Sequence, residues 1–166
     1  SMQALAAAAC LDAYPLLIVV PATLRLGWAE ECEKWLTFLL PTDIHVIFSS
    51  TDRPPPQTPK VVVVSYKMLH RLRSDLLSRA WQLVIFDESH TLRTPKSRVD
   101  VQQTSTAVRL IRKVRRCLLL SGTPSPHRPM DMFLQLDALH GGLLGASRFE
   151  FAKSFCDVVR FPFYSV

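Results

Sequence analysis

The chain has 166 residues, of which 48% are hydrophobic and 20% are charged, with a formal net charge of +6. This length is typical of one domain, and this composition argues against intrinsic disorder. The apolar runs fall far short of the roughly 20 residues that cross a membrane, so we expect no transmembrane segment. The four cysteines are widely spaced and form no CxxC pair, which argues against a zinc site or a disulfide framework and favours a reducing compartment.

Short apolar runs alternate with helical patterns along the chain. In order, the sequence predicts helix 3–12, strand 16–20, helix 26–39, strand 44–48, strand 61–64, helix 67–72, strand 83–86, helix 99–114, strand 117–120 and helices 129–139 and 147–155. The strand segments are continuously apolar, as expected for strands buried on both faces of a parallel sheet. This alternation predicts a doubly wound α/β domain with right-handed crossovers. Three tryptophans are interpreted as packing residues: Trp28, Trp35 and Trp81.

Most of the positive charge lies between residues 93 and 128. This segment holds nine Lys or Arg and one acid, Asp100, so it carries +8 and the rest of the chain carries −2. Such a stretch can contact phosphates. It can equally be the solvated face of a helix, and charge alone does not decide between the two.

Two adjacent carboxylates, Asp87 and Glu88, directly follow the apolar segment 83–86, and His90 lies two residues further on. Ligands of doubly wound sheets bind at the carboxyl ends of the strands. The first carboxylate could hold Mg²⁺ through water, and the second could polarise an attacking water. An acidic cap before a helix is the alternative interpretation, but it does not account for His90 or for the polar cluster downstream.

That cluster is Ser121, Gly122, Thr123 and Pro124, which follows the apolar segment 118–120. Hydroxyls on both sides of a glycine form a hydrogen-bonded turn that can respond to a nearby phosphate or carboxylate. Taken alone, a plain turn before the next helix is the preferred interpretation. Polar residues also follow two of the three remaining strands, at 21–24 and at 65–67.

Four such strand ends in this order resemble the first RecA-like lobe of superfamily 2 helicases, and more narrowly the SNF2 family of double-stranded DNA translocases. The stretch 21–28 resembles motif Ia, 64–69 (VSYKML) motif Ib, 87–90 (DESH) motif II and 118–125 (LLLSGTPS) motif III. The run 87–97 is similar to the family pattern DE-x-H-x-L-K-N, with Arg93 and Thr94 in place of the usual Lys and Asn. DESH, Arg128-Pro129 and Phe155-Cys156-Asp157 resemble the annealing-helicase (HARP-like) branch.

The resemblance covers nearly the whole chain and implies a RecA-like (P-loop NTPase) lobe with a mainly parallel sheet flanked by helices. It also implies the function of a full-length protein: an ATP-dependent DNA translocase or annealing helicase in the nucleus. The protein would act on double-stranded or branched DNA in DNA repair, replication-fork remodelling or chromatin. Its cofactors would be ATP and Mg²⁺, and a second RecA-like lobe would complete the motor.

The resemblance further implies roles for single residues. Asp87 would bind Mg²⁺-ATP through water, and Glu88 would activate the attacking water. The residues that couple nucleotide state to DNA grip would be His90, Ser121, Gly122 and Thr123. Those that contact DNA phosphates would be Thr23, Arg25, Tyr66 and Lys67.

The phosphate-binding loop of the family has no counterpart in the sequence. Only five glycines occur, and none forms a Gly-x-x-x-x-Gly-Lys-Ser/Thr pattern. Gln3-Ala4-Leu5 matches the start of the helix that follows this loop in the family. We therefore expect a partial lobe at 3–166 behind an expression scar at 1–2, inactive by itself and without bound ATP or Mg²⁺.

In RecA-like lobes, the strand that feeds the phosphate-binding loop lies beside the motif III strand. Its absence would leave the segment 117–120 unpaired on one side. Unpaired N–H and C=O groups of an apolar strand invite pairing with another chain. We therefore expect the isolated chain to self-associate.

Two other functions compete with the motor. The chain could be a non-catalytic lobe that only binds DNA or protein, and the missing phosphate-binding loop would be its expected sign. The intact DESH and SGTP sequences argue against such degeneration. A nuclease built on a helicase lobe would need further carboxylate clusters, which the sequence does not contain.

Overall fold

The computed structural model describes residues 1–54, 59–92, 98–123 and 129–156, except for the side chains of 98 and 99. Some residues of the motifs named above lie outside the described part of the chain: 93–97, 124–128 and 157. Within it the strands are β1 (Leu16–Val20), β2 (Ile44–Val46), β3 (Val61–Ser65), β4 (Leu83–Phe86) and β5 (Cys117–Leu119). The α-helices are α1 (Met2–Cys10), α2 (Arg25–Trp35), α3 (Tyr66–Arg71), α4 (Arg73–Ser78), α5 (Arg98–Lys113), α6 (Phe133–Leu139) and α7 (Arg148–Phe155). Four short 3₁₀ turns complete the description: η1 (Ala22–Leu24), η2 (Pro41–Asp43), η3 (Ser89–Thr91) and η4 (Pro129–Met132).

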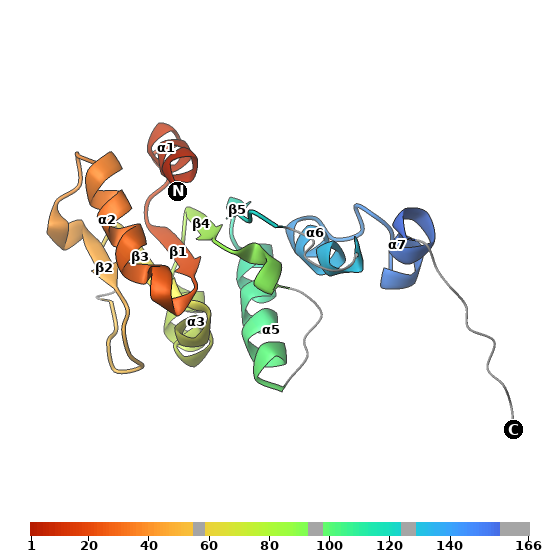
Figure 1. Cartoon of the computed structure of the whole chain (residues 1–166). Coiled ribbons are helices and arrows are strands. Elements are labelled where there is room, and N and C mark those ends of the chain that lie inside the picture. The colour runs from red at the N-terminus through yellow and green to blue at the C-terminus, as the bar shows by residue number, and fades with distance from the viewer. Residues whose placement is uncertain (55–58, 93–97, 124–128, 157–166) are drawn as a thin grey trace, which may run out of the picture.

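The strands form one sheet in the order β2-β3-β1-β4-β5, and every pair is parallel. The central strand β1 pairs with β3 and β4, so that Ile18 lies between Val63 and Ile85. Because all strands run the same way, their carboxyl ends meet at one edge of the sheet (Figure 1). The predicted α/β class, with a parallel sheet flanked by helices, is confirmed.

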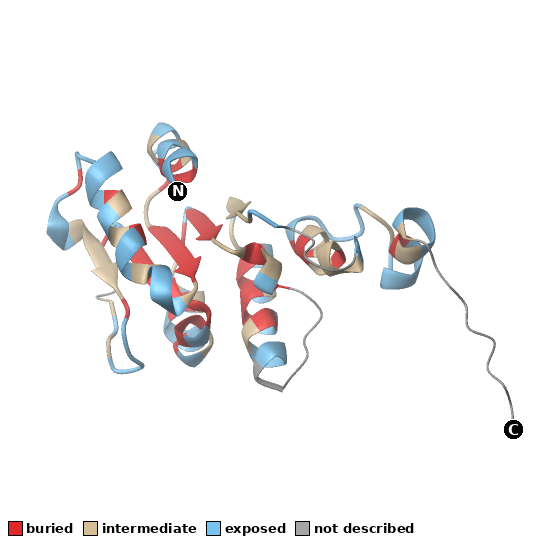
Figure 2. Ribbon diagram, in the orientation of Figure 1, coloured by how far each residue is buried: buried red, intermediate tan, exposed pale blue. Residues whose placement is uncertain are grey.

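Two hydrophobic cores cover the two faces of the sheet. Successive side chains of a strand point to opposite faces, so Leu17 and Val19 pack with α3, α4 and α5. Leu16, Ile18 and Val20 pack instead with α1 and α2. Burial on both faces explains the continuous apolar sequence of β1, β3 and β4, which Figure 2 shows as buried. Each such side chain contributes about 1.5–3 kcal/mol to folding.

The edge strands differ from the central ones. β2 and β5 are only half-buried, and β4 is the only strand among the described residues that pairs with β5. The outer side of β5 therefore has the unpaired backbone groups expected from the sequence. Self-association through this edge stays a prediction.

The structure departs from the prediction at several elements: α6 begins at Phe133 instead of at residue 129, β2 ends at Val46 instead of at residue 48, and α2 and α4 differ most. α2 ends at Trp35 instead of at residue 39, because Leu36 leaves the helical conformation with φ −105° and ψ 58°. Leu36 and Leu39 still pack into the core although they follow the helix. Trp35, which was interpreted as a packing residue, is instead 44% exposed. The short helix α4 was not predicted, although it buries Leu76. Among the described helices, none has both the length and the apolar character required of a membrane span.

Candidate functional site

Asp87 lies at the carboxyl edge of the sheet, directly after β4. Its backbone N–H donates to the carbonyl of Val19 at 2.9 Å and so continues the ladder beyond the strand. One carboxylate oxygen, Oδ2, accepts from the indole Nε1 of Trp28 at 2.8 Å, and the other, Oδ1, accepts from the backbone N–H of Glu88 at 3.0 Å. Hydrogen bonds to an ionised carboxylate are stronger than neutral ones. Asp87 is therefore fixed in position at the end of the strand.

Tyr66 supports the same residue from β3's side of the sheet. Its hydroxyl donates to the backbone carbonyl of Asp87 at 2.8 Å, and the ring packs on Phe86 with centroids 6.0 Å apart. Burial raises the pKa of the Tyr66 hydroxyl, so the group stays protonated and able to donate. This placement favours a positioning role for Tyr66 over the phosphate contact expected from the sequence.

Glu88 adopts a left-handed backbone conformation, with φ 50° and ψ 47°. Its carboxylate Oε2 lies 3.1 Å from Nδ1 of His90, and this same nitrogen lies 3.0 Å from the Ser121 hydroxyl. With Nδ1 protonated, His90 can donate to either oxygen. The side chain of Glu88 remains 38% exposed, so its carboxylate can reach a water molecule outside the protein.

The turn after β5 meets this network through Ser121. The Ser121 hydroxyl accepts from the backbone N–H of Thr123 at 3.2 Å, while Gly122 and Thr123 themselves are exposed. The structure therefore brings together Glu88, His90 and Ser121, which come from the ends of β4 and β5. Gly122 and Thr123 follow Ser121 in the same turn, and Thr123 meets the group through its backbone N–H.

The four residues expected to contact DNA lie after β1 and β3, at the same edge of the sheet. Thr23 and Lys67 are exposed. Arg25 is already engaged: its guanidinium donates to the carbonyls of Ala22 and Ile47 at 2.9 and 2.7 Å and stacks over the ring of Phe48. Thr23 and Lys67 are thus available to a ligand, whereas Arg25 and Tyr66 hold the surrounding structure.

Three side chains of this region make hydrogen bonds that were not anticipated from the sequence: Trp28, Gln135 and Tyr66. Trp28 was interpreted as a packing residue, and it is only 5% exposed in the core, but its indole also anchors Asp87. A buried tryptophan usually finds a partner for its N–H, and this was the available signal. Gln135 accepts a hydrogen bond from Ser89 across 46 positions in the chain, and nothing in the sequence indicated that contact.

The acidic residues fit a magnesium ion held through water better than a closed metal cage. Mg²⁺ keeps several waters and needs only one or two protein carboxylates. Asp87 offers one fixed carboxylate at the strand edge, next to the exposed carboxylate of Glu88. Within the part of the chain that the structure describes, no three His, Cys, Asp or Glu residues form a metal-binding cluster.

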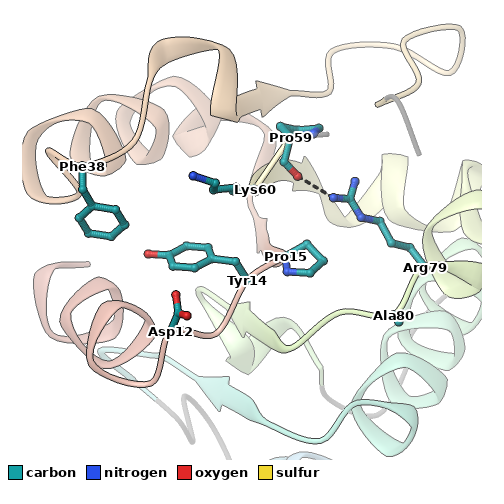
Figure 3. A pocket seen from close by; sticks show the side chains of 8 residues that line it. All are labelled: Asp12, Tyr14, Pro15, Phe38, Pro59, Lys60, Arg79 and Ala80. Carbon is teal, nitrogen blue, oxygen red and sulfur yellow. Dashed lines mark hydrogen bonds between the residues drawn. The ribbon is translucent and has the colours of Figure 1, made fainter. Parts of the chain in front are cut away.

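A separate pocket lies at the opposite end of the strands, where β1, β3 and β4 begin (Figure 3). It has a volume of about 500 Å³ and is lined by Asp12, Tyr14, Pro15, Phe38, Pro59, Lys60, Arg79 and Ala80. Its two cations already have partners: Arg79 donates to the carbonyl of Pro59 at 2.6 Å, and Lys60 lies 3.5 Å from the carboxylate of Asp43. None of the residues predicted to be functional lines this pocket, so the carboxyl edge is the candidate site.

Comparison with known proteins identifies the family of the chain. Residues 5–163 match the family model described as the SNF2-related domain. The human "DNA annealing helicase and endonuclease ZRANB3" is 38% identical over 150 residues, which cover 88% of this chain and 13% of that protein. The Drosophila melanogaster "SWI/SNF-related matrix-associated actin-dependent regulator of chromatin subfamily A-like protein 1" is 37% identical over 148 residues, which cover 88% of this chain and 18% of that protein.

A solved structure shows the same fold. The "Sulfolobus solfataricus SWI2/SNF2 ATPase core in complex with dsDNA" superposes with a TM-score of 0.69 at 21% sequence identity, covering 91% of this chain and 30% of that one. The expected RecA-like lobe is thereby confirmed, and the resemblance to the annealing-helicase branch agrees with the relatives. The chain belongs to the SNF2-related domain family.

Proposed function

We propose that the chain is the partial N-terminal lobe, residues 3–166, of the ATP-dependent motor of a DNA translocase or annealing helicase. The observation that carries the proposal is the hydrogen-bonded network of Asp87, Glu88, His90 and Ser121 at the carboxyl edge of the sheet. Membership of the SNF2-related family and the annealing-helicase name of the relatives support it. The setting we propose is the nucleus, in DNA repair, replication-fork remodelling or chromatin.

Asp87 and Glu88 divide the chemistry of ATP hydrolysis between them. Bound ATP and Mg²⁺ supply the phosphoryl group and the positive charge that stabilises it. Asp87, locked by Trp28 and Tyr66, presents its carboxylate to the metal's water shell. Glu88, which is partly exposed, orients the attacking water and accepts its proton.

His90 and Ser121 connect this pair to the turn after β5. Nδ1 of His90 lies within hydrogen-bonding distance of both the Glu88 carboxylate and the Ser121 hydroxyl. A change at Glu88 therefore strengthens or weakens the hydrogen bond between His90 and Ser121. That change in turn moves the exposed residues Gly122 and Thr123. In this way the turn couples the state of the nucleotide to the grip on DNA.

The DNA surface we propose lies at the ends of β1 and β3. Exposed Thr23 and Lys67 contact phosphates, while Arg25 and Tyr66 hold the loops that present them. Phosphate contacts of this kind carry no sequence information. The partners we propose are double-stranded or branched DNA and a second RecA-like lobe.

The decisive variant is Glu88→Gln, made in a polypeptide that carries both lobes and the phosphate-binding loop. It keeps the size of the side chain and removes its basicity, so DNA-stimulated ATP hydrolysis should fall by about 10² or more while ATP binding is retained. Glu33→Gln, which alters an exposed acid of α2 outside the site, should leave the rate unchanged. Hydrolysis by Glu88→Gln at the wild-type rate would favour a lobe that only binds DNA or protein. The 166-residue chain, which has no Gly-x-x-x-x-Gly-Lys-Ser/Thr pattern, should not hydrolyse ATP by itself.

A further inference from the structure

Ser89 and Gln135 form a hydrogen bond inside the protein. The Ser89 hydroxyl donates to Oε1 of Gln135 at 2.9 Å, and the two residues are only 2% and 5% exposed. Ser89 lies between Glu88 and His90, while Gln135 lies on α6. Buried polar side chains depend on their protein partners because water cannot replace them. The contact therefore ties the turn after β4 to a helix that follows β5.

The backbone of Ser89 is held as firmly as its side chain. Its N–H donates to the carbonyl of Leu120 at 2.8 Å, and its carbonyl accepts from the N–H of Leu92 at 2.8 Å. The preceding residue, Glu88, has the unfavourable φ of 50°. A non-glycine residue keeps such a conformation only where its surroundings impose it. The three bonds of Ser89 are the restraint immediately next to Glu88.

α6 is itself anchored away from the site. Asp137 of α6 accepts from Arg112 of α5 at 2.8 Å, and Ala138 packs into the core under α5. At the start of α6, the ring of Phe133 lies 5.4 Å from the ring of Phe151 in α7. Gln135 thus stands on a helix whose position depends on α5 and α7 as well as on the sheet.

We propose that Gln135 is a positioning residue for the hydrolysis reaction: through Ser89 it fixes the turn that presents the Glu88 carboxylate and the His90 imidazole. A displacement of α6 then changes the reach of Glu88 without any direct contact between them. This inference rests on the proposed function, because it assigns Gln135 to the same site.

Amide hydrogen exchange on the isolated chain tests the physical half of the proposal. Gln135→Leu keeps the approximate volume and removes the acceptor, so the amides of Ser89 and Leu92 should exchange at least tenfold faster. The amides of β1 and β3 should keep their rates. Gln102→Leu, the same exchange at an exposed position of α5, is the matched control and should leave Ser89 unchanged. Equal exchange at Ser89 in wild type and Gln135→Leu would overturn the proposal.

Steady-state kinetics in a polypeptide with both lobes tests the catalytic half. Gln135→Leu and Ser89→Ala should each lower kcat about tenfold, with the KM for ATP and the affinity for DNA unchanged. The double variant should lose no more than either single one, and Ser89→Thr, which keeps the hydroxyl, should recover most of the rate. Loss of kcat together with a matching rise in KM or loss of DNA affinity would overturn the positioning role in favour of general destabilisation.

The Glu88→Gln variant separates the two proposals. If it is inactive while Gln135→Leu has the wild-type kcat, the positioning role fails and the motor function stands. If Glu88→Gln hydrolyses ATP normally, the proposed function fails, and the role of Gln135 in catalysis fails with it. Faster exchange at Ser89 would in that case still report the mechanical link to α6.

Discussion

The two ends of the sheet treat their polar residues in opposite ways. At the carboxyl edge, both oxygens of Asp87 accept hydrogen bonds, and Ser89 makes bonds with its backbone and its side chain. At the amino end, the Tyr14 hydroxyl is buried and has no hydrogen-bond partner among the described residues. The polar groups of Asp87 and Ser89 at the carboxyl edge are thus satisfied by hydrogen bonds, whereas the unpartnered hydroxyl of Tyr14 at the amino end lowers the stability of the fold.

The same contrast is seen in the backbone. Each end has one non-glycine residue with positive φ among the described residues: Asp12 with φ 45° at the amino end and Glu88 with φ 50° at the carboxyl edge. Asp tolerates this left-handed region comparatively well, while a longer side chain such as that of Glu is disfavoured there. The backbone of Glu88 is therefore imposed by its surroundings, whereas that of Asp12 is compatible with the residue itself.

The largest effect should come from the bond that fixes Asp87. Trp28→Phe keeps an aromatic ring but removes the indole N–H and part of the buried volume, so the free energy of unfolding should fall by about 2 kcal/mol. Trp35→Phe on the same helix removes an exposed indole bonded to Glu31 and should change the free energy of unfolding by less than about 0.5 kcal/mol. Urea unfolding of both variants measures the difference. Equal losses would show that the indole bond to Asp87 is no stronger than a surface contact.

A smaller effect of opposite sign is expected at the amino end. Tyr14→Phe removes the unpartnered hydroxyl and keeps the edge-to-face contact with Phe38, whose centroid lies 6.1 Å away. The free energy of unfolding should rise by about 1 kcal/mol. Urea unfolding checks this as well. A clear loss of stability would mean that Tyr14 does have a hydrogen-bond partner in solution.

Alkaline pH should lower the stability of the fold through the core that contains Cys32, against which Tyr14 packs. Burial raises the pKa of the Tyr14 hydroxyl from 10.0 to about 12 and that of the Cys32 thiol from 9.0 to about 12. Between these values the folded state binds more protons than the unfolded state, so stability is complete below pH 9 and falls as the pH rises toward 12. Thermal unfolding as a function of pH should show a shallower fall for Cys32→Ala than for Cys10→Ala, which alters an exposed thiol.

The smallest effect concerns the exposed cation at the carboxyl edge. DNA binding by the chain should be weak, salt-dependent and independent of sequence. Lys67→Gln should reduce the slope of log affinity against log salt by about 1, because one phosphate contact is lost. Lys34→Gln changes a cation near the far end of α2 and should not alter the slope. Fluorescence anisotropy with a duplex across a salt series decides between them, and equal slopes for all three proteins would remove Lys67 from the DNA surface.

The sequence alone predicted the parallel sheet and the polar residues that meet at its carboxyl edge. The strands were predictable because burial on both faces requires continuous apolar runs, and Asp87, Glu88, His90 and Ser121 directly follow two of them. The end of α2 was not predictable from periodicity, because Leu36 and Leu39 stay buried after the helix has ended. The bond between Ser89 and Gln135 was also out of reach, because it depends on how α6 packs rather than on any local pattern.

The left-handed backbone of Glu88 has a consequence for the evolution of such lobes. A residue other than glycine loses about 1–2 kcal/mol in this conformation, and a glycine at the same place would not. Glu88→Gly should therefore relieve strain in the fold while removing the carboxylate that we propose to act on the attacking water. Under the proposed function, selection for hydrolysis would keep the less stable residue here at the expense of stability. A gene copy released from that selection could gain stability by this single exchange, so glycine at this position would identify lobes that have kept the fold and given up the reaction.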